Sequence, residues 1–290
     1  LEEIIRRLAG KVHREINDLN PILDARMSDG SRIHAVNRNV AINGPILSIR
    51  RFPEQSITIE DLLEWGTISA EAAGLLKRLI ACGYNIFISG GTSSGKTTLL
   101  NVLTGFIPAD ERLIVIEDSA ELQIQGVENI VRMECRSANV QGKGEVGIRQ
   151  LIKASLRMRP DRIIVGEVRG SEVMDMLQAM NTGHDGSLST GHANSTLGML
   201  SRIEAMYLMA EPLPIDAIRR QIVEAIDIIV HLGRMPDKSR KVMEIAEVEG
   251  FEGGKYTINP LFVYQMNRGL ISTGNRIKNS AKAERKGLSL

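Results

Sequence analysis

The sequence predicts an α/β protein whose core is a mostly parallel β-sheet, preceded by a small α+β domain. From residue 86 onward, short apolar runs typical of buried strands alternate with segments of helical apolar spacing, as in sheets covered on both faces. A glycine-rich stretch, Gly90–Thr97, joins one such strand to the next helix. The 290 residues, 43% hydrophobic and 24% charged, have the composition of a globular protein large enough for two domains.

Residues 1–53 are expected to form the small α+β domain. Residues 1–19 have the apolar spacing of an amphipathic helix, and residues 22–27, 32–36 and 45–50 predict three strands. Because the chain begins at Leu1, inside this helix and without methionine, we expect the domain to be truncated at its start. Residues 54–66 are interpreted as a linker that contains a short helix capped by Thr58 and Asp61.

Residues 67–290 are expected to form the larger domain, with strands near its C-terminus and a polar, mobile tail over 275–290. Apolar periodicity, capping residues, glycines and prolines define the elements in order. We expect helices over 69–83, 97–103, 147–158, 171–180, 194–208 and 214–226, and strands over 85–89, 113–116, 162–165, 188–190, 228–232, 242–248, 255–258 and 261–264.

The stretch that begins at Gly90 fits the phosphate-loop pattern of Gly, four free positions, Gly, Lys and Thr. Such a loop points backbone N–H groups at phosphate oxygens, and the following helix adds its positive N-terminal end. Lys96 and Thr97 directly follow the second glycine, as the pattern requires, which disfavours an ordinary Gly/Ser-rich turn. In such a loop the lysine reaches the β- and γ-phosphates and the hydroxyl group ligates Mg²⁺. The expected phosphate-binding residues are Gly91, Thr92, Ser93, Ser94, Gly95, Lys96, Thr97 and Thr98.

Carboxylates follow two of the expected strands. Glu167 comes just after the strand 162–165, where a carboxylate can support the metal and the attacking water. An ordinary surface glutamate is the less favoured alternative. Glu117 and Asp118 follow the strand 113–116, where a carboxylate could orient or deprotonate that water, and an acidic helix cap fits the spacing equally well.

Two histidines, His184 and His192, flank the short strand 188–190 in a setting rich in glycine and hydroxyl residues. A lone histidine is more often structural, but this pair could hydrogen-bond a γ-phosphate. Metal ligation is disfavoured, because no cysteine or third histidine lies nearby in the sequence.

The composition argues against several other classes of protein. A net charge of +1 and an aromatic content of 3% give no reason to expect a nucleic-acid partner. Cys82 and Cys135 lack metal-ligand spacing and suggest a reduced, cytosolic setting. No apolar run is long enough to span a bilayer, and no signal peptide is visible.

The four motifs are the phosphate loop, the acidic stretch that begins at Glu117, the Gly166–Glu167 pair and the stretch with the two histidines. In this order along the chain they resemble the motifs of the type II/IV secretion ATPase superfamily, in its VirB11-like branch. Glu117–Glu121 is similar to the family's acidic box, Gly166–Glu167 to its Walker B strand and 184–192 to its histidine box. Residues 178–188 and 192–195 look closest to the CpaF/TadA group, which assembles tight-adherence (Flp) pili. The resemblance covers about residues 24–248.

The resemblance implies a RecA-like core that binds ATP and Mg²⁺ at a domain junction. Such subunits form homohexamers at the cytoplasmic face of the inner membrane, where hydrolysis moves pilin through a membrane platform protein. By resemblance, Glu117 activates water, Glu167 supports metal and water, and Thr97 contacts Mg²⁺. His192, His184, Arg32 and Arg50 correspond to residues that contact the γ-phosphate.

Other functions remain open at this stage. A type IV secretion (VirB11-like) ATPase is the main alternative to a pilus motor. A nucleic-acid motor on the same core is less favoured, because the chain has few aromatic residues and a net charge near zero. A non-hydrolysing scaffold is less favoured, because the acidic residues that hydrolysis needs are all present.

Overall fold

The computed structural model describes residues 1–51, 56–136, 138 and 143–288. The chain divides into two compact units, Leu1–Ser56 and Ile57–Leu290. Each unit has its own buried apolar core, and each is described separately below.

The first unit is one helix packed on a three-stranded antiparallel sheet of order β1-β2-β3. The elements are α1 (Glu2–Lys11), β1 (Ile22–Arg26), β2 (Arg32–Val36) and β3 (Ile46–Arg50). Its core consists of Ile5, Ala9, Ile16, Leu23, Ile33 and Ala35.

The helix expected over residues 1–19 is wrong in its second half. It ends at Lys11, His13 adopts a positive φ of 52°, and the Arg14 N–H donates to the carbonyl of Ala9 at 3.0 Å. This reversal returns Ile16 to the core, so its apolar side chain reflects burial in a turn rather than a continuing helix.

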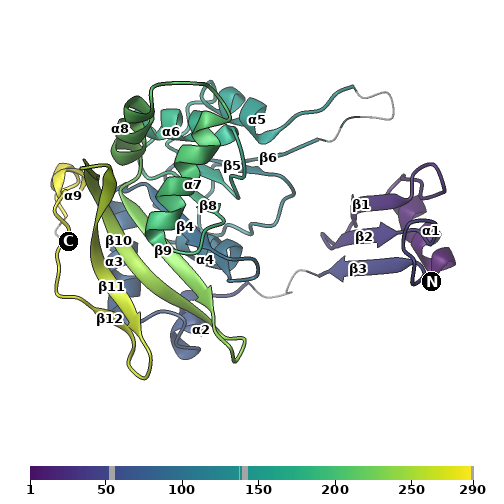
Figure 1. The fold of residues 1–290 in the computed structure, drawn as a ribbon, viewed down its shortest axis with the longest axis horizontal. Coiled ribbons are helices and arrows are strands. Elements are labelled where there is room, and N and C mark those ends of the chain that lie inside the picture. Colours follow the sequence, from purple (N-terminus) through teal and green to yellow (C-terminus); the bar gives the residue numbers. More distant parts are fainter. Residues whose placement is uncertain (52–55, 137, 139–142, 289–290) are drawn as a thin grey trace. The chain divides into compact units, whose positions relative to one another are not determined.

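The second unit is built on a nine-stranded sheet of order β12-β11-β10-β9-β4-β8-β7-β5-β6 (Figure 1). The run from β9 to β6 is parallel, and β9, β10, β11 and β12 pair antiparallel. This confirms the predicted α/β fold. The strands are β4 (Ile86–Gly90), β5 (Leu113–Glu117), β6 (Ile130–Glu134), β7 (Arg162–Val165), β8 (Leu188–Gly191), β9 (Ile228–Arg234), β10 (Arg240–Glu252), β11 (Lys255–Gln265) and β12 (Gly269–Ser272).

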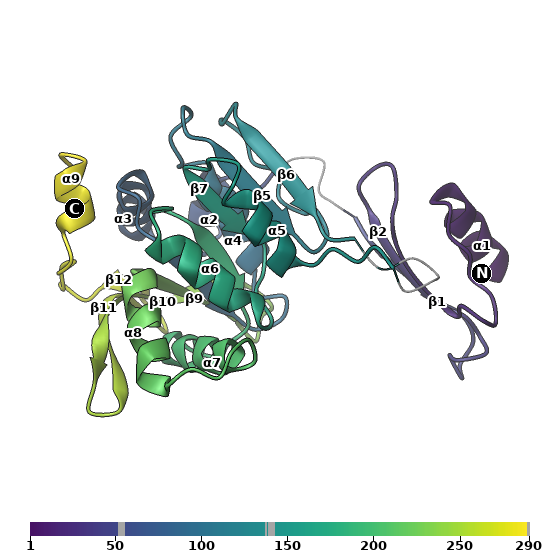
Figure 2. The ribbon, with the colours of Figure 1, turned by 90° about the horizontal axis from the view of Figure 1, so that it is seen from above.

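Helices cover both faces of this sheet (Figure 2). One face carries α2 (Ile59–Glu64), α3 (Ala70–Ala81) and α4 (Lys96–Thr104), and the other carries α5 (Ile148–Ser155), α6 (Glu172–Asn181), α7 (Thr196–Leu208) and α8 (Ile215–Ala225). Within β4, Ile86 and Ile88 pack into the apolar core on the α2–α4 face of the sheet, and Phe87 packs into the core on the α5–α8 face. This explains the continuous apolar run, since a strand covered on both faces has no polar side.

Residues 57–66, which the sequence suggested as part of a linker, belong to the second unit. Thr58 and Asp61 form the capping box expected of them, and Leu62 of α2 is buried in the same apolar core as the residues of α3. Residues 54 and 55 of that linker, and Phe52 and Pro53 before it, lie outside the described residues.

The two short strands expected on either side of Pro260 are one continuous strand, β11. The pairing of β10 with β11 shifts register here, from Ile245 opposite Phe262 to Ala246 opposite Pro260. A register shift is a position where a strand tolerates proline, which has no N–H to donate.

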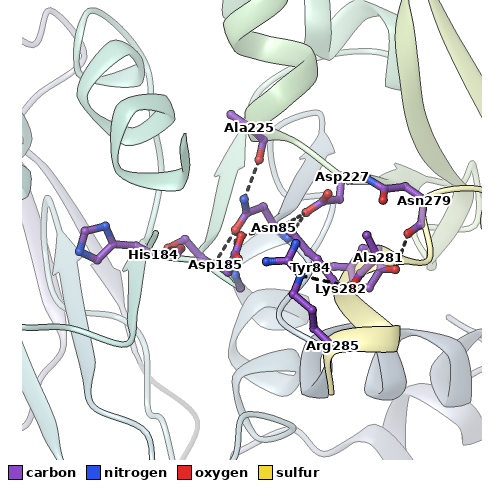
Figure 3. A network of polar contacts seen from close by, with 12 residues as sticks. Tyr84, Asn85, His184, Asp185, Ala225, Asp227, Asn279, Ala281, Lys282 and Arg285 are labelled. Atoms are coloured by element: carbon purple, nitrogen blue, oxygen red, sulfur yellow. Dashed lines mark hydrogen bonds and ion pairs between the residues drawn. The ribbon is translucent and has the colours of Figure 1, made fainter. Parts of the chain in front are cut away.

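The C-terminal tail was expected to be mobile, but its described part docks on the core (Figure 3). Helix α9 (Ala281–Arg285) buries Ala283, and Glu247 accepts hydrogen bonds from the backbone N–H groups of Lys278 and Asn279. Lys282 Nζ lies 2.8 Å from Asp185 Oδ1 and 2.7 Å from Asp227 Oδ2. Residues 289 and 290 lie outside the described residues.

The same network fixes the amino ends of the central strands (Figure 3). Just before β4, Asn85 Oδ1 accepts from the N–H groups of Gly186 and Ser187 before β8. The Asn85 N–H donates to Asp227, just before β9, at 2.7 Å. Burial raises the pKa of Asp227, and the ammonium of Lys282 opposes that rise.

In the part of the chain that the structure describes, no helix is both long and apolar enough to cross a membrane.

Replacing Lys282 with methionine should lower the free energy of unfolding by about 2–3 kcal/mol, because a buried carboxylate that loses its cationic partner is strongly destabilised. Urea denaturation measures the change, and Lys286→Met, at an exposed position of the same segment, is the matched control. Equal stability of the two variants would show that the Lys282 ion pairs do not hold the tail.

Candidate functional site

The predicted motifs meet at the carboxyl edge of the parallel sheet. Strand β4 pairs with β8, β8 with β7 and β7 with β5. The register aligns Ser89 with Gly191 and Ile116 with Val165, so the segments after these strands leave the sheet at one edge. This edge is where open α/β sheets bind their ligands.

The phosphate-loop sequence forms a tight turn between β4 and α4. Gly95 has a φ of 97°, which favours glycine, and a Cβ on Gly90 would lie 2.5 Å from Ser94 Oγ and 2.7 Å from the Leu232 carbonyl oxygen. Ser94 Oγ is buried and has no hydrogen-bond partner among the described residues. The turn therefore has the close backbone approach and an unsatisfied polar group, as expected of a phosphate cradle.

Lys96 begins α4 and is 7% exposed. Its Nζ donates to the Gly91 carbonyl at 2.9 Å and lies 3.3 Å from His192 Nδ1. Burial lowers the pKa of Lys96, and the nearby Glu167 carboxylate opposes that shift. A phosphate oxygen at this position would supply a stronger partner for the ammonium than a carbonyl does.

His192 links Lys96 to Glu167. Its Nε2 lies 2.6 Å from Glu167 Oε1, while its Nδ1 faces the lysine. Burial lowers the pKa of His192, although Glu167 acts in the opposite direction. A neutral imidazole fits these contacts, because Nδ1 can accept from the Lys96 ammonium while the proton is on Nε2, although Glu167 Oε1 accepts no hydrogen bond from the described residues.

Glu117 ends β5 and is only 4% exposed. Its Oε1 accepts from the N–H groups of Glu121 and Leu122 at 2.8 and 2.9 Å, so it caps a loop rather than a helix. Burial raises the pKa of Glu117 despite these two hydrogen bonds. A Cβ on Gly166 would lie 3.1 Å from Glu117 Cγ, so the glycine before Glu167 lets the two strand ends approach.

The structure does not bring His184 to this group and so does not support the contact with the γ-phosphate that was expected of it. It lies before the amino end of β8 beside Asp185, and its Nδ1 is 3.1 Å from the Ala179 carbonyl (Figure 3). His192 follows the other end of the same strand, whose residues rise ~3.3 Å each. Two histidines that flank one strand therefore lie at opposite edges of the sheet.

Arg32 and Arg50 belong to the first unit, where they are directly opposite each other on β2 and β3. Arg26 on β1 is opposite Arg32, which gives a row of three arginines across the sheet. Directly opposed residues share a sheet face. Arg26 was not among the predicted site residues, although it ends a strand just before the turn-forming residues Ser28–Gly30.

Three further residues near this site were not predicted from the sequence. Arg169 Nε and Nη2 donate to Glu167 Oε2, His231 Nδ1 lies 3.1 Å from Ser89 Oγ, and Arg240 Nε lies 3.4 Å from the Ser93 carbonyl. Arg169 is two residues after Glu167, and His231 interrupts the apolar run of β9. No local sequence signal marks Arg240, whose position depends on the pairing of β10 with β9.

The residues present fit Mg²⁺ bound together with phosphate. The Thr97 hydroxyl group in the first turn of α4 and the Glu167 carboxylate supply oxygen donors, and Mg²⁺ typically takes one or two carboxylates and otherwise phosphate and water oxygens. No group of three or more His, Cys, Asp or Glu side chains is arranged to hold a metal ion in the described part of the chain.

Gly90→Ala should lower the free energy of unfolding by about 1–3 kcal/mol, because the new methyl group meets a backbone carbonyl. Gly91→Ala is the matched control, since a Cβ there has no atom within 4 Å and the φ is not positive. Thermal unfolding of both variants tests this. Equal effects of the two substitutions would contradict the close approach at Gly90.

Comparison with known proteins identifies the family. The family described as "Type II/IV secretion system protein" matches residues 1–277. Conjugal transfer protein TrbB of Rhizobium radiobacter is 34% identical over 258 residues, which are 88% of this chain and 76% of that protein. Type IV secretion system protein VirB11 of Bartonella henselae is 32% identical over 279 residues, covering 83% of this chain and 78% of that one. The crystal structure of the VirB11 ATPase from the Brucella suis type IV secretion system, in complex with sulphate, matches with a TM-score of 0.56 and 28% identity over 85% of this chain and 80% of that one. The chain belongs to the type II/IV secretion system protein family.

Proposed function

We propose that this chain is the ATPase subunit of a secretion-type machine and hydrolyses ATP with Mg²⁺ at the carboxyl edge of its sheet. The observation that carries the proposal is the line of contacts from Lys96 through His192 to Glu167 beside the phosphate loop. Family membership supports it, because the Brucella suis relative is an ATPase.

The residues divide into binding and chemical roles. The backbone of the loop from Gly91 to Gly95, together with Thr98 in the first turn of α4, binds phosphate, and Lys96 neutralises it. Thr97 and Glu167 would hold Mg²⁺, which neutralises charge on the transferring phosphoryl group. His192 is positioned to exchange its contact with Lys96 for one with the γ-phosphate.

Glu117 is the proposed base for the attacking water. Its buried position raises its pKa, which makes the carboxylate a better proton acceptor near neutral pH. The two backbone hydrogen bonds to Oε1 hold the group in one orientation while leaving Oε2 for the water.

We place the machine at the cytoplasmic face of the inner membrane, with the chain working as a homohexamer. The finer proposal is assembly of a tight-adherence (Flp) pilus through a membrane platform protein, based on the CpaF/TadA-like residues 178–188 and 192–195. The second candidate is type IV secretion or conjugal transfer, favoured by the relatives VirB11 and TrbB. The membrane protein that co-purifies with the chain distinguishes the two.

The arginine row of the first unit, Arg26, Arg32 and Arg50, supplies the remaining proposed contacts. The three arginines are directly opposite one another on adjacent strands, so their side chains leave the sheet on the same face. We propose that Arg32 and Arg50 stabilise charge on the γ-phosphate of their own or a neighbouring subunit's nucleotide.

Glu117→Gln should bind ATP as the wild type does but turn it over ~10²-fold more slowly, because the amide cannot accept a proton. The fold should survive, since the amide oxygen can still accept both backbone hydrogen bonds. Single-turnover hydrolysis and nucleotide titration measure the two effects, with the exposed Glu128→Gln as control. Wild-type turnover in Glu117→Gln would exclude the residue as the base.

Arg50→Ala should reduce turnover by ~10³-fold and leave ADP affinity unchanged, because ADP lacks the phosphate being contacted. Arg50→Lys should restore little, since a point charge cannot replace a guanidinium fork. Arg38→Ala, at a mostly exposed arginine of the same unit, is the control. Normal single-turnover rates in both Arg50→Ala and Arg32→Ala would remove the first unit from catalysis.

A further inference from the structure

Arg169 lies in the site but has no part in the chemistry described above. It follows β7 by four residues, and its guanidinium group faces two carboxylates from neighbouring strand ends. Nε and Nη2 lie 2.9 and 2.6 Å from Glu167 Oε2, and Nη1 lies 3.8 Å from Asp118 Oδ2. Glu167 Oε1 lies 2.6 Å from His192 Nε2 but accepts no hydrogen bond from the described residues.

The backbone that carries Arg169 is fixed in place. The N–H groups of Arg169 and Gly170 both donate to Glu172 Oε1, at 2.6 and 2.9 Å. The Val168 N–H donates to the Thr190 carbonyl on β8, and Thr190 Oγ1 donates to the Gly166 carbonyl. The position of Arg169 beside Glu167 is thus set by the fold and does not depend on the side chain alone.

The two partners differ in their freedom to move. The Arg169 side chain is 64% exposed, whereas that of Glu167 is 20% exposed. An exposed arginine can leave an ion pair and become hydrated with little loss, because exposed pairs are weakly stabilising. The carboxylate stays where the site needs it.

Arg169 and Mg²⁺ are both cations that compete for the Glu167 carboxylate. In the function proposed above, Glu167 supports Mg²⁺, which needs oxygen donors and is repelled by a guanidinium group on the same carboxylate. Arg169 pairs with Glu167 Oε2, and its charge opposes the approach of a metal cation to either oxygen of this carboxylate.

We infer that Arg169 is the resident counter-ion of Glu167 in the nucleotide-free subunit and leaves it when Mg²⁺ and nucleotide bind. The inference rests on the proposed function. It makes Arg169 a positioning residue that sets the Mg²⁺ concentration at which nucleotide is accepted. Until then it keeps the Glu167 carboxylate neutralised and aimed at His192.

The test measures binding rather than turnover. Calorimetric titration with the non-hydrolysable analogue adenylyl imidodiphosphate, repeated over a series of Mg²⁺ concentrations, gives the half-saturating Mg²⁺ for each variant. Arg169→Gln should lower that concentration by roughly threefold, the size expected for one exposed ion pair. Arg169→Lys should lie between wild type and Arg169→Gln, because it keeps the charge but not the fork.

The matched control is Arg219→Gln, which removes an arginine that pairs through two nitrogens with Glu204 on the surface helices α7 and α8. It should retain the wild-type Mg²⁺ dependence. An unchanged or higher Mg²⁺ requirement in Arg169→Gln would overturn the inference while leaving the ATPase proposal intact. Absence of Mg²⁺-dependent analogue binding to the wild-type chain would overturn both.

Discussion

The parallel pairing of β4 with β8 on one side and β9 on the other is the constraint on which the site depends. It sets the phosphate loop, which follows β4, beside His192, which follows β8, and beside His231 in β9. Lys96 reaches His192 only because these strand ends are aligned. The next strand, β7, then carries Glu167 to the other side of His192.

The same strands are fixed at their other ends by a separate network. Asn85, Asp227 and Lys282 join the amino ends of β4 and β9 to the C-terminal helix α9. Burial raises the pKa of Asp227 and burial lowers that of Lys96, so both ends of the sheet hold ionisable groups out of water. At the amino end the charges have protein partners, whereas at the carboxyl edge Lys96 is held by a carbonyl and a neutral histidine. That contrast explains why phosphate chemistry is assigned to one edge only.

Much of the second unit could be predicted from the sequence, because buried parallel strands, capping residues and the phosphate-loop spacing are local signals. Glu117 ends β5 and Glu167 comes just after β7, and a parallel sheet brings such positions to one edge. The role predicted for His184 is not supported for the same geometric reason, since this residue precedes the strand that His192 follows. Arg169, Arg240 and the docked tail depend on side-chain reach or distant pairing, which no local pattern encodes. The end of α1 was missed because Ile16 keeps the helical spacing while packing from a turn.

The central claim is that the carboxyl edge of the sheet binds Mg²⁺ and a nucleoside triphosphate between the phosphate loop and Glu167. A crystal structure of the chain with Mg²⁺ and a non-hydrolysable ATP analogue tests it most directly. The account predicts phosphates against the backbone of residues 91–97, with Lys96 on the γ-phosphate and the metal contacting Thr97 on the side of Glu167. A nucleotide bound elsewhere, or a Lys96 that keeps its contacts with Gly91 and His192, would contradict it.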